Sequence, residues 1–120
     1  MSSASLTRLR TICLALPASH EVEAWGTPTF RVKNKIFAIH STPDKHHADG
    51  RHAVWLHCAA ENQRALIAAE PARYFVPPYV GPRGWVGVWI DQRPRWRDIE
   101  PLIRDAYRRV APKTLAVLVT

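Results

Sequence analysis

The chain has 120 residues, of which 47% are hydrophobic and 22% are charged. This length and balance are typical of one self-sufficient globular domain, so we expect a single domain over residues 1–120. No run approaches the roughly 20 consecutive apolar residues of a membrane-spanning helix, which excludes that class. Seventeen lysines and arginines against ten acidic residues give a net charge of +7. That excess favours a polyanionic partner, although an arginine-rich composition also arises without any functional demand.

The N-terminal residues and the cysteines indicate the compartment. Residues 1–5 lack a charged start followed by an apolar run, so we expect no signal peptide. Cys13 and Cys58 fit buried free thiols in a reducing environment. We therefore expect a cytoplasmic location.

Hydrophobic periodicity predicts one helix and then three strands in the first third of the chain. The apolar residues at helical spacing are Leu6, Leu9, Cys13 and Leu16. Pro17 is expected to end this helix. Strands are predicted over 20–25, 28–33 and 35–40, and a tight turn at 33–35 uses the tolerance of Asn34 for positive φ. The polar stretch 41–50 is predicted to be a loop.

The remaining two thirds of the chain predict two more helices and three more strands. Residues 51–58 alternate as a strand, and the alanine-rich segment 59–69 favours a helix. Prolines surround a short strand at 73–76, and a further strand covers 84–91. The last helix is predicted from about Trp96 to Val110, and it is expected to stop near Pro112. Its start is open, because Pro101 also suits the first turn of a helix capped by Asp98.

Strands between terminal helices, without regular βαβ alternation, predict an α+β fold. We expect an antiparallel sheet with the N- and C-terminal helices packed on one face, a two-layer sandwich. Alternation along the strands then separates two faces of the sheet. The expected core face comprises Phe30, Val32, Phe37, Ile39, Val54, Leu56, Cys58, Val86, Val88 and Ile90. The expected opposite face comprises Arg31, Lys33, His40, Trp55, His57, Trp85 and Trp89.

Tryptophan interleaved with positive charge is a surface that suits nucleic acid. Indole rings stack on bases, and nearby arginine or lysine binds phosphate. Two alternatives remain open. The tryptophans at 55, 85 and 89 would form a second small core if the proline-rich segment 71–82 packed over them. They would otherwise form a protein-binding face, because tryptophan and arginine are enriched at interface hot spots.

The last helix carries a second concentration of positive charge. Its expected buried stripe comprises Ile99, Leu102, Ile103, Ala106 and Val110, and Arg97, Arg104 and Arg108 lie on the opposite side of the helical projection. Acidic neighbours compensate part of this charge, so plain solvation is the alternative. The candidate nucleic-acid-binding residues are thus Arg31, Lys33, Lys35, Trp55, Arg83, Trp85, Trp89, Arg97, Arg104 and Arg108.

The histidines and carboxylates do not predict a metal site, a cofactor or an enzyme. Five histidines gather at positions 40, 46, 47, 52 and 57, but no H-x-x-x-H on a helix and no paired C-x-x-C is present. Glu21 and Glu23 share a strand face, which suits a paired-carboxylate site. The alternatives are two solvated strand residues, or partners for Arg31 and Lys33. The sequence contains neither a nucleophile elbow nor a glycine-rich phosphate loop.

Short phrases in a fixed order connect the chain with a known family. They are Leu14-Ala15-Leu16-Pro17, Trp25-Gly26-Thr27-Pro28-Thr29-Phe30-Arg31-Val32, Lys35-Ile36-Phe37-Ala38, Pro77-Pro78-Tyr79, Gly84-Trp85-Val86 and Ala106-Tyr107-Arg108-Arg109-Val110-Ala111-Pro112-Lys113. Over roughly residues 5–115 the chain resembles the MmcQ/YjbR family of small bacterial proteins.

The resemblance implies a CyaY-like (frataxin-like) fold and DNA binding through a so-called double-wing surface. Iron binding of the frataxin type is not expected on this basic chain. Tyr79 and Tyr107 match the family phrases and are expected to be structural, with their rings in the core. The sequence therefore predicts a small non-enzymatic DNA-binding protein. The alternative is an adaptor that binds protein or a small ligand on the tryptophan face.

Overall fold

The computed structural model describes residues 4–41 and 51–119, so the predicted loop at 42–50 lies outside the described residues. The elements are α1 (Ala4–Leu14), β1 (Ser19–Ala24), β2 (Thr27–Val32), β3 (Lys35–Ser41), β4 (Ala53–Leu56), α2 (Ala60–Ala69), β5 (Tyr74–Phe75), the 3-10 turn η1 (Gly81–Arg83), β6 (Val86–Trp89), α3 (Trp96–Val110) and α4 (Lys113–Ala116). None of the helices within these residues has the length and hydrophobicity of a membrane-spanning helix.

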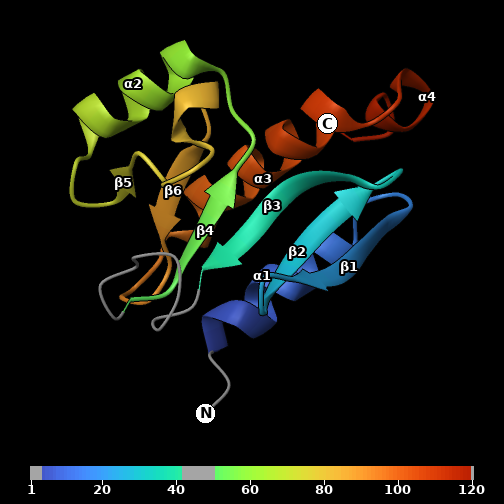
Figure 1. Ribbon diagram of the computed structural model, residues 1–120, viewed down its shortest axis with the longest axis horizontal. Helices are drawn as coiled ribbons and strands as arrows, with labels where there is room; N and C mark the ends of the chain where they lie inside the picture. The colour runs from blue at the N-terminus through green and yellow to red at the C-terminus, as the bar shows by residue number, and fades with distance from the viewer. Residues whose placement is uncertain (1–3, 42–50, 120) are drawn as a thin grey trace.

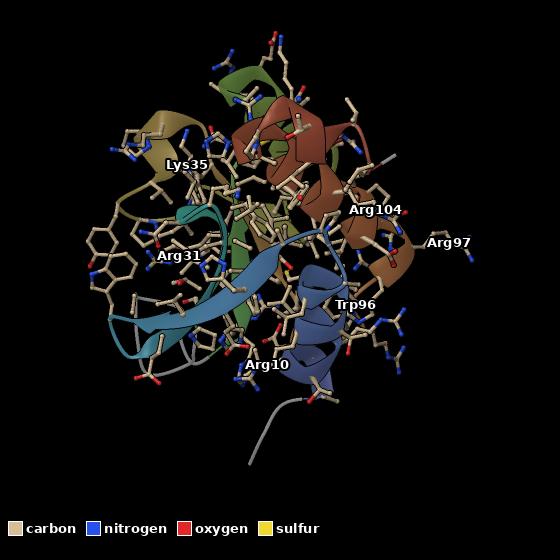
Figure 2. All side chains as sticks on the ribbon, turned by 90° about the vertical axis from the view of Figure 1, so that its right-hand side faces the viewer. Arg10, Arg31, Lys35, Trp96, Arg97 and Arg104 are labelled. Carbon is tan, nitrogen blue, oxygen red and sulfur yellow. The ribbon has the colours of Figure 1, made fainter. Side chains whose placement is uncertain are left out.

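The strands form one six-stranded sheet in the order β1-β2-β3-β4-β6-β5. Every pairing in it is antiparallel. Helices α1 and α3 pack behind the sheet (Figure 1). Seen from the side, sheet and helices form two layers (Figure 2). The predicted α+β fold, with terminal helices on one face of an antiparallel sheet, is confirmed.

Two tight turns define the hairpins of the first three strands. Lys33 and Asn34 both take positive φ, at 49° and 64°, as a two-residue turn between twisted strands requires. Trp25 and Gly26 do the same between β1 and β2, at 55° and 75°. This second turn places a tryptophan at a hairpin tip, outside the strand alternation.

The main core lies between the sheet and helices α1 and α3. Ile99, Ile103 and Ala106 on α3 are buried, which confirms most of the predicted stripe. Tyr107 is fully buried, stacks edge-on against Phe37 at 5.5 Å between ring centroids, and donates a hydrogen bond to the carbonyl oxygen of Pro17 at 2.6 Å. Each such fully buried large side chain stabilises the fold by roughly 1.5–3 kcal/mol.

A bulge in β3 corrects the predicted faces of two residues. Phe30 pairs with Ala38 and Arg31 pairs with Ile36, so Phe37 is an extra residue in the ladder. Beyond the bulge the alternation is reversed. Ile39, predicted in the core, therefore lies on the opposite face, and His40, predicted on that face, is buried on the helix side across from Val54.

The end of one helix differs from the prediction, whereas the last helix has the predicted bounds, 96–110. Helix α1 ends at Leu14, and a short turn covers the residues up to Pro17. Helix α3 begins at Trp96 with Arg95 at its N-cap, so Pro101 lies inside the helix and not in its first turn. The turn η1 and the one-turn helix α4 were not predicted, because each has only a few residues and no periodic pattern.

Candidate nucleic-acid interface

The tryptophans of the sheet face form a second small core. Trp55 and Trp85 do lie together on the face opposite α1 and α3, but only 3% and 5% of their surfaces are exposed. They pack with Ile39, and the partly buried Ile36, Phe75 and Val80 surround them. The prediction that the tryptophans form an open surface is therefore wrong for Trp55 and Trp85, because the segment after β5 folds over the sheet.

Trp89 lies on the same face at the end of β6, and other side chains of the protein already pack against its ring. Its ring is stacked on Phe75 at 4.2 Å between centroids. The guanidinium of Arg51 lies 4.1 Å from the ring centroid and pairs with Asp91 at 2.9 Å. A cation held over an indole in this way contributes roughly 0.5–1 kcal/mol at a surface site. These contacts make Trp89 a structural residue at the end of β6.

Two adjoining hollows form what we call the sheet trough. The first, with a volume of about 450 Å³, is lined by Trp25, Ile39, Trp55, Tyr79 and Val80. The second, about 410 Å³, shares Trp25, Ile39 and Val80 with the first and is lined further by Lys35, Ile36, His57, Arg83, Trp85 and Val110. Hollows of this size fall in the range of ligand sites. One end of the trough is aromatic and the other end is basic.

The walls of the aromatic end are exposed. Trp25 is 65% exposed and Tyr79 is 70% exposed, while Ile39 and Trp55 beneath them are buried. The ring centroids of Tyr79 and Trp55 are 6.4 Å apart at 49°. The prediction that the ring of Tyr79 lies in the core is wrong. Its φ of 66°, after two prolines, turns the side chain outward from the loop.

Sequence reasoning missed Trp25 and Tyr79 as site residues. Both occur in the family phrases, and both adjoin the turn-forming residues glycine and proline. A large aromatic residue at a turn has little access to the core. That position was the signal that could have identified them.

The basic end of the trough lacks acidic partners. Lys35 and Arg83 line it, and Arg31 and Lys33 belong to the adjoining strand and turn. Among the carboxylates that the structure describes, none lies within ion-pair distance of any of these side chains. Arg31 donates a hydrogen bond to the hydroxyl of Thr29 at 3.1 Å. Lys35 and Arg83 thus form a positive rim of the trough, and two further predicted binding residues, Arg31 and Lys33, lie on the adjoining strand and turn.

His57 lies between the rim and helix α3. Its Nδ1 accepts a hydrogen bond from Nε of Arg109 at 3.0 Å, and its ring lies 5.2 Å from that of Trp85. Burial, together with Arg109 and Arg83, lowers the pKa of His57 from its ordinary value. The imidazole is therefore neutral at pH 7 and adds no charge to the rim.

The basic face of α3 is largely neutralised. Arg104 pairs with Glu100 at 2.5 Å, and Arg108 pairs with Asp105. Arg108 also donates to the carbonyl oxygen of Val119 at 3.1 Å. Figure 2 shows Arg97 and Arg104 on the helix side and Arg31 and Lys35 on the sheet side. The structure therefore does not bring the predicted binding residues into one surface.

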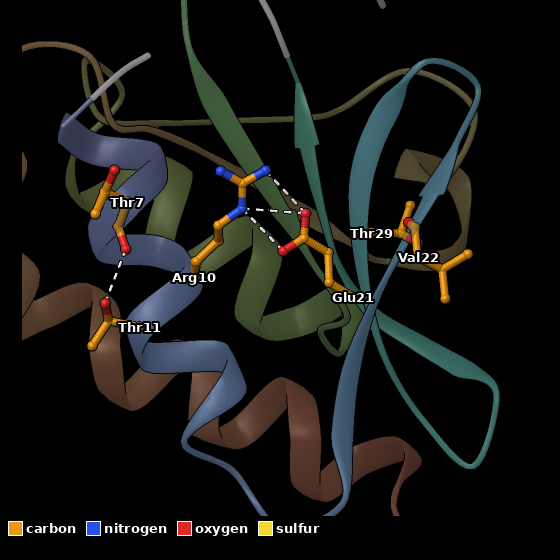
Figure 3. A network of polar contacts seen from close by, with 6 residues as sticks. All are labelled: Thr7, Arg10, Thr11, Glu21, Val22 and Thr29. Carbon is orange, nitrogen blue, oxygen red and sulfur yellow. Dashed lines mark hydrogen bonds and ion pairs between the residues drawn. The ribbon is translucent and has the colours of Figure 1, made fainter.

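The carboxylate pair at Glu21 and Glu23 does not form a site. Arg10 of α1 donates from Nε and Nη2 to the carboxylate of Glu21 at 3.0 Å, which ties the helix to β1 (Figure 3). Glu23 is exposed. Glu23 thus fits the alternative of a solvated strand residue, whereas Glu21 has an ion-pair partner that was not predicted, Arg10 in place of Arg31 or Lys33.

The histidines that the structure describes do not converge on a metal position. His40 and His52 are neighbours, with Nε2 and Nδ1 3.3 Å apart, but His57 lies across the sheet at the trough. Among the described residues, no group of three potential ligands is arranged for a metal. His46 and His47 lie outside the described residues.

The fold and the comparisons give the class of protein. The model of the YjbR family matches residues 14–109, and the chain belongs to this family. The crystal structure of the Deinococcus radiodurans protein DR2400, which has a DUF419 domain, shares the fold. Its TM-score is 0.75 at 22% identity, over 94% of this chain and 86% of that one. No curated protein matches the sequence.

Proposed function

We propose that this chain is a small, non-enzymatic nucleic-acid-binding protein and that the sheet trough is its interface. The observation that carries the proposal is the combination of exposed aromatic rings and unneutralised positive charge in one depression. Trp25 and Tyr79 supply the rings, and Lys35 and Arg83 supply the charge. Proteins that bind single-stranded nucleic acid combine these same two elements, aromatic platforms and a positive groove along the backbone.

The charge distribution favours the sheet side over the helix side. A phosphate that approaches Arg104 or Arg108 must compete with a carboxylate that is already paired with it. A phosphate that approaches Lys35 or Arg83 displaces no described carboxylate. Binding through the rim releases counterions from the nucleic acid without breaking ion pairs of the protein.

The lining of the trough supports a binding role and not catalysis. Among its described residues, none is a serine, threonine, cysteine, aspartate or glutamate. General acid–base or nucleophilic chemistry also uses histidine, lysine and tyrosine, and the lining has one of each in Lys35, His57 and Tyr79. Such a group needs a second one within hydrogen-bond reach that activates it. His57 is held by Arg109, and no carboxylate belongs to the described lining around it.

A second candidate is an adaptor that binds protein or a small ligand at the aromatic end. The exposed Trp25 and Tyr79 favour it, because tryptophan and tyrosine beside an apolar depression are typical of interaction hot spots. The two functions differ in their salt dependence. Apolar docking on the rings changes little with salt, whereas phosphate contacts weaken steeply.

Fluorescence anisotropy with a labelled duplex and a labelled single strand tests the proposal. If Lys35 and Arg83 of the rim and the adjoining Arg31 and Lys33 all contact phosphates, the log–log slope of affinity against salt should be roughly −3.6 on duplex and −2.8 on single strands. Replacing Lys35 and Arg83 with glutamine should flatten that slope by about one unit for each phosphate that is no longer bound. The matched control replaces Arg104 and Arg108 with glutamine and should leave the slope unchanged. Absence of binding to either nucleic acid at low salt would end the proposal.

A further inference from the structure

We infer that the trough selects single-stranded nucleic acid, with one unstacked base inserted between Trp25 and Tyr79 and the adjoining phosphates on Lys35 and Arg83. This inference rests on the proposed function and specifies its ligand. It follows from the division of the trough into an aromatic hollow and a basic hollow that share a wall.

The aromatic hollow is built for a flat apolar group. Its floor is the buried pair Ile39 and Trp55, and its walls are the exposed rings of Trp25 and Tyr79. Both wall residues take positive φ at turns, which holds their side chains out from the sheet. Every nucleobase has a face that stacks on such rings, so the hollow fits a base without selecting its identity.

The basic hollow supplies charge next to the base. Lys35 and Arg83 line it beside Trp25, Ile39 and Val80, the residues that also line the aromatic hollow. A ligand that fills both hollows must be flat and apolar at one end and anionic at the other. A nucleotide within a strand has this pattern, because each base is joined through its sugar to a phosphate.

A duplex cannot use the aromatic hollow in the same way. Its bases are already stacked and paired, so filling the hollow would require a base to leave the helix, which is unfavourable. Bases of a single strand are available without that penalty. The geometry therefore predicts a preference for single strands over duplexes, in addition to the attraction that phosphates supply to both.

The test compares three fluorescein-labelled DNA ligands of about 16 nucleotides. They are oligo-dT, a single strand of the same length made of abasic sites, and a duplex. Wild-type protein should bind oligo-dT at least about fivefold more tightly than the abasic strand, because only the base differs. Trp25→Ala and Tyr79→Ala should each weaken oligo-dT binding by roughly 5- to 150-fold and leave the abasic strand unchanged.

Conservative variants and a distant control separate stacking from folding. Trp25→Phe and Tyr79→Phe keep a ring and should restore most of the affinity for oligo-dT. Val117→Ser alters an equally exposed apolar side chain, 74% exposed, near the C-terminus and should change nothing. Melting curves should be alike for all these variants, because each replaced side chain is largely solvated.

The outcomes distinguish this inference from the proposed function. If oligo-dT and the abasic strand bind equally, or the alanine variants bind oligo-dT normally, the base does not enter the hollow and the inference is wrong. Steep salt dependence in that case would still support the proposed function through phosphate contacts. If the duplex binds more tightly than oligo-dT, the preference for single strands is wrong. If no ligand binds, both fail together.

Discussion

The side-chain amide of Gln63 donates a hydrogen bond to the carbonyl oxygen of Trp85 at 2.6 Å. The same amide donates to the carbonyl oxygen of Gly81 at 3.0 Å, and Gln63 is buried although it lies on a largely exposed helix. These bonds fasten α2 to the segment that carries Tyr79, Val80 and Arg83. The walls of the trough therefore depend on a residue that does not line it.

Replacing Gln63 with alanine should leave two carbonyl groups without this donor. We expect the free energy of unfolding to fall by about 1–3 kcal/mol, because buried polar groups without partners are costly. Chemical denaturation measures the loss. The matched control is Arg64→Ala, an exposed neighbour on the same helix, which should change stability by less than about 0.5 kcal/mol. Equal stability of the two variants would contradict a structural role for the amide.

The buried His40 should make the protein less stable in mild acid. Burial, with His52 and Arg10 facing it, lowers its pKa from 6.5 to about 4. Between these values the unfolded chain binds a proton that the native protein does not. The free energy of unfolding should therefore fall as the pH drops from about 6.5 to 4, by up to about 3 kcal/mol from this residue.

Denaturation curves at several pH values check this expectation. His40→Gln should have a shallower loss of stability over that interval than the wild type, whatever its stability at pH 7. His20→Gln, the same substitution at an exposed position, is the matched control. An unchanged pH dependence in His40→Gln would show that this residue is not protonated on unfolding.

Metal should not stabilise the protein. Because no three potential ligands converge among the described residues, near-equimolar Zn²⁺ or Fe²⁺ should leave the melting temperature unchanged. A metal that binds only the native state would raise that temperature by mass action. Differential scanning fluorimetry with and without metal measures this. A clear upward shift of the melting temperature would show that histidines of the chain, His46 and His47 included, form a metal site. That result would contradict the sequence analysis.

Strand alternation predicted which tryptophans share a face but not whether they are exposed. Trp55 and Trp85 do share one face, since alternation depends only on the local backbone. Their burial depends on residues 76–84, which fold over the sheet and are held there by Gln63. Such a contact joins positions far apart in the chain, and no local pattern records it.

The bulge at Phe37 could not be predicted from the sequence, for a different reason. Residues 36–39 are all apolar, so no polar residue shows which side chains of this segment face solvent.

The neutralisation of the candidate binding charges could not be predicted either. Helical periodicity grouped Arg104 and Arg108 correctly, but their neutralisation by Glu100 and Asp105 depends on side-chain geometry.

An NMR titration of the labelled protein with oligo-dT tests the central claim most directly, because it locates the ligand residue by residue. We expect the largest shifts at the indole N–H of Trp25 and at the amides of Lys35, Tyr79 and Arg83, with little change along Trp96–Val110. Shifts concentrated on Arg97, Arg104 and Arg108, with the trough unchanged, would contradict the account.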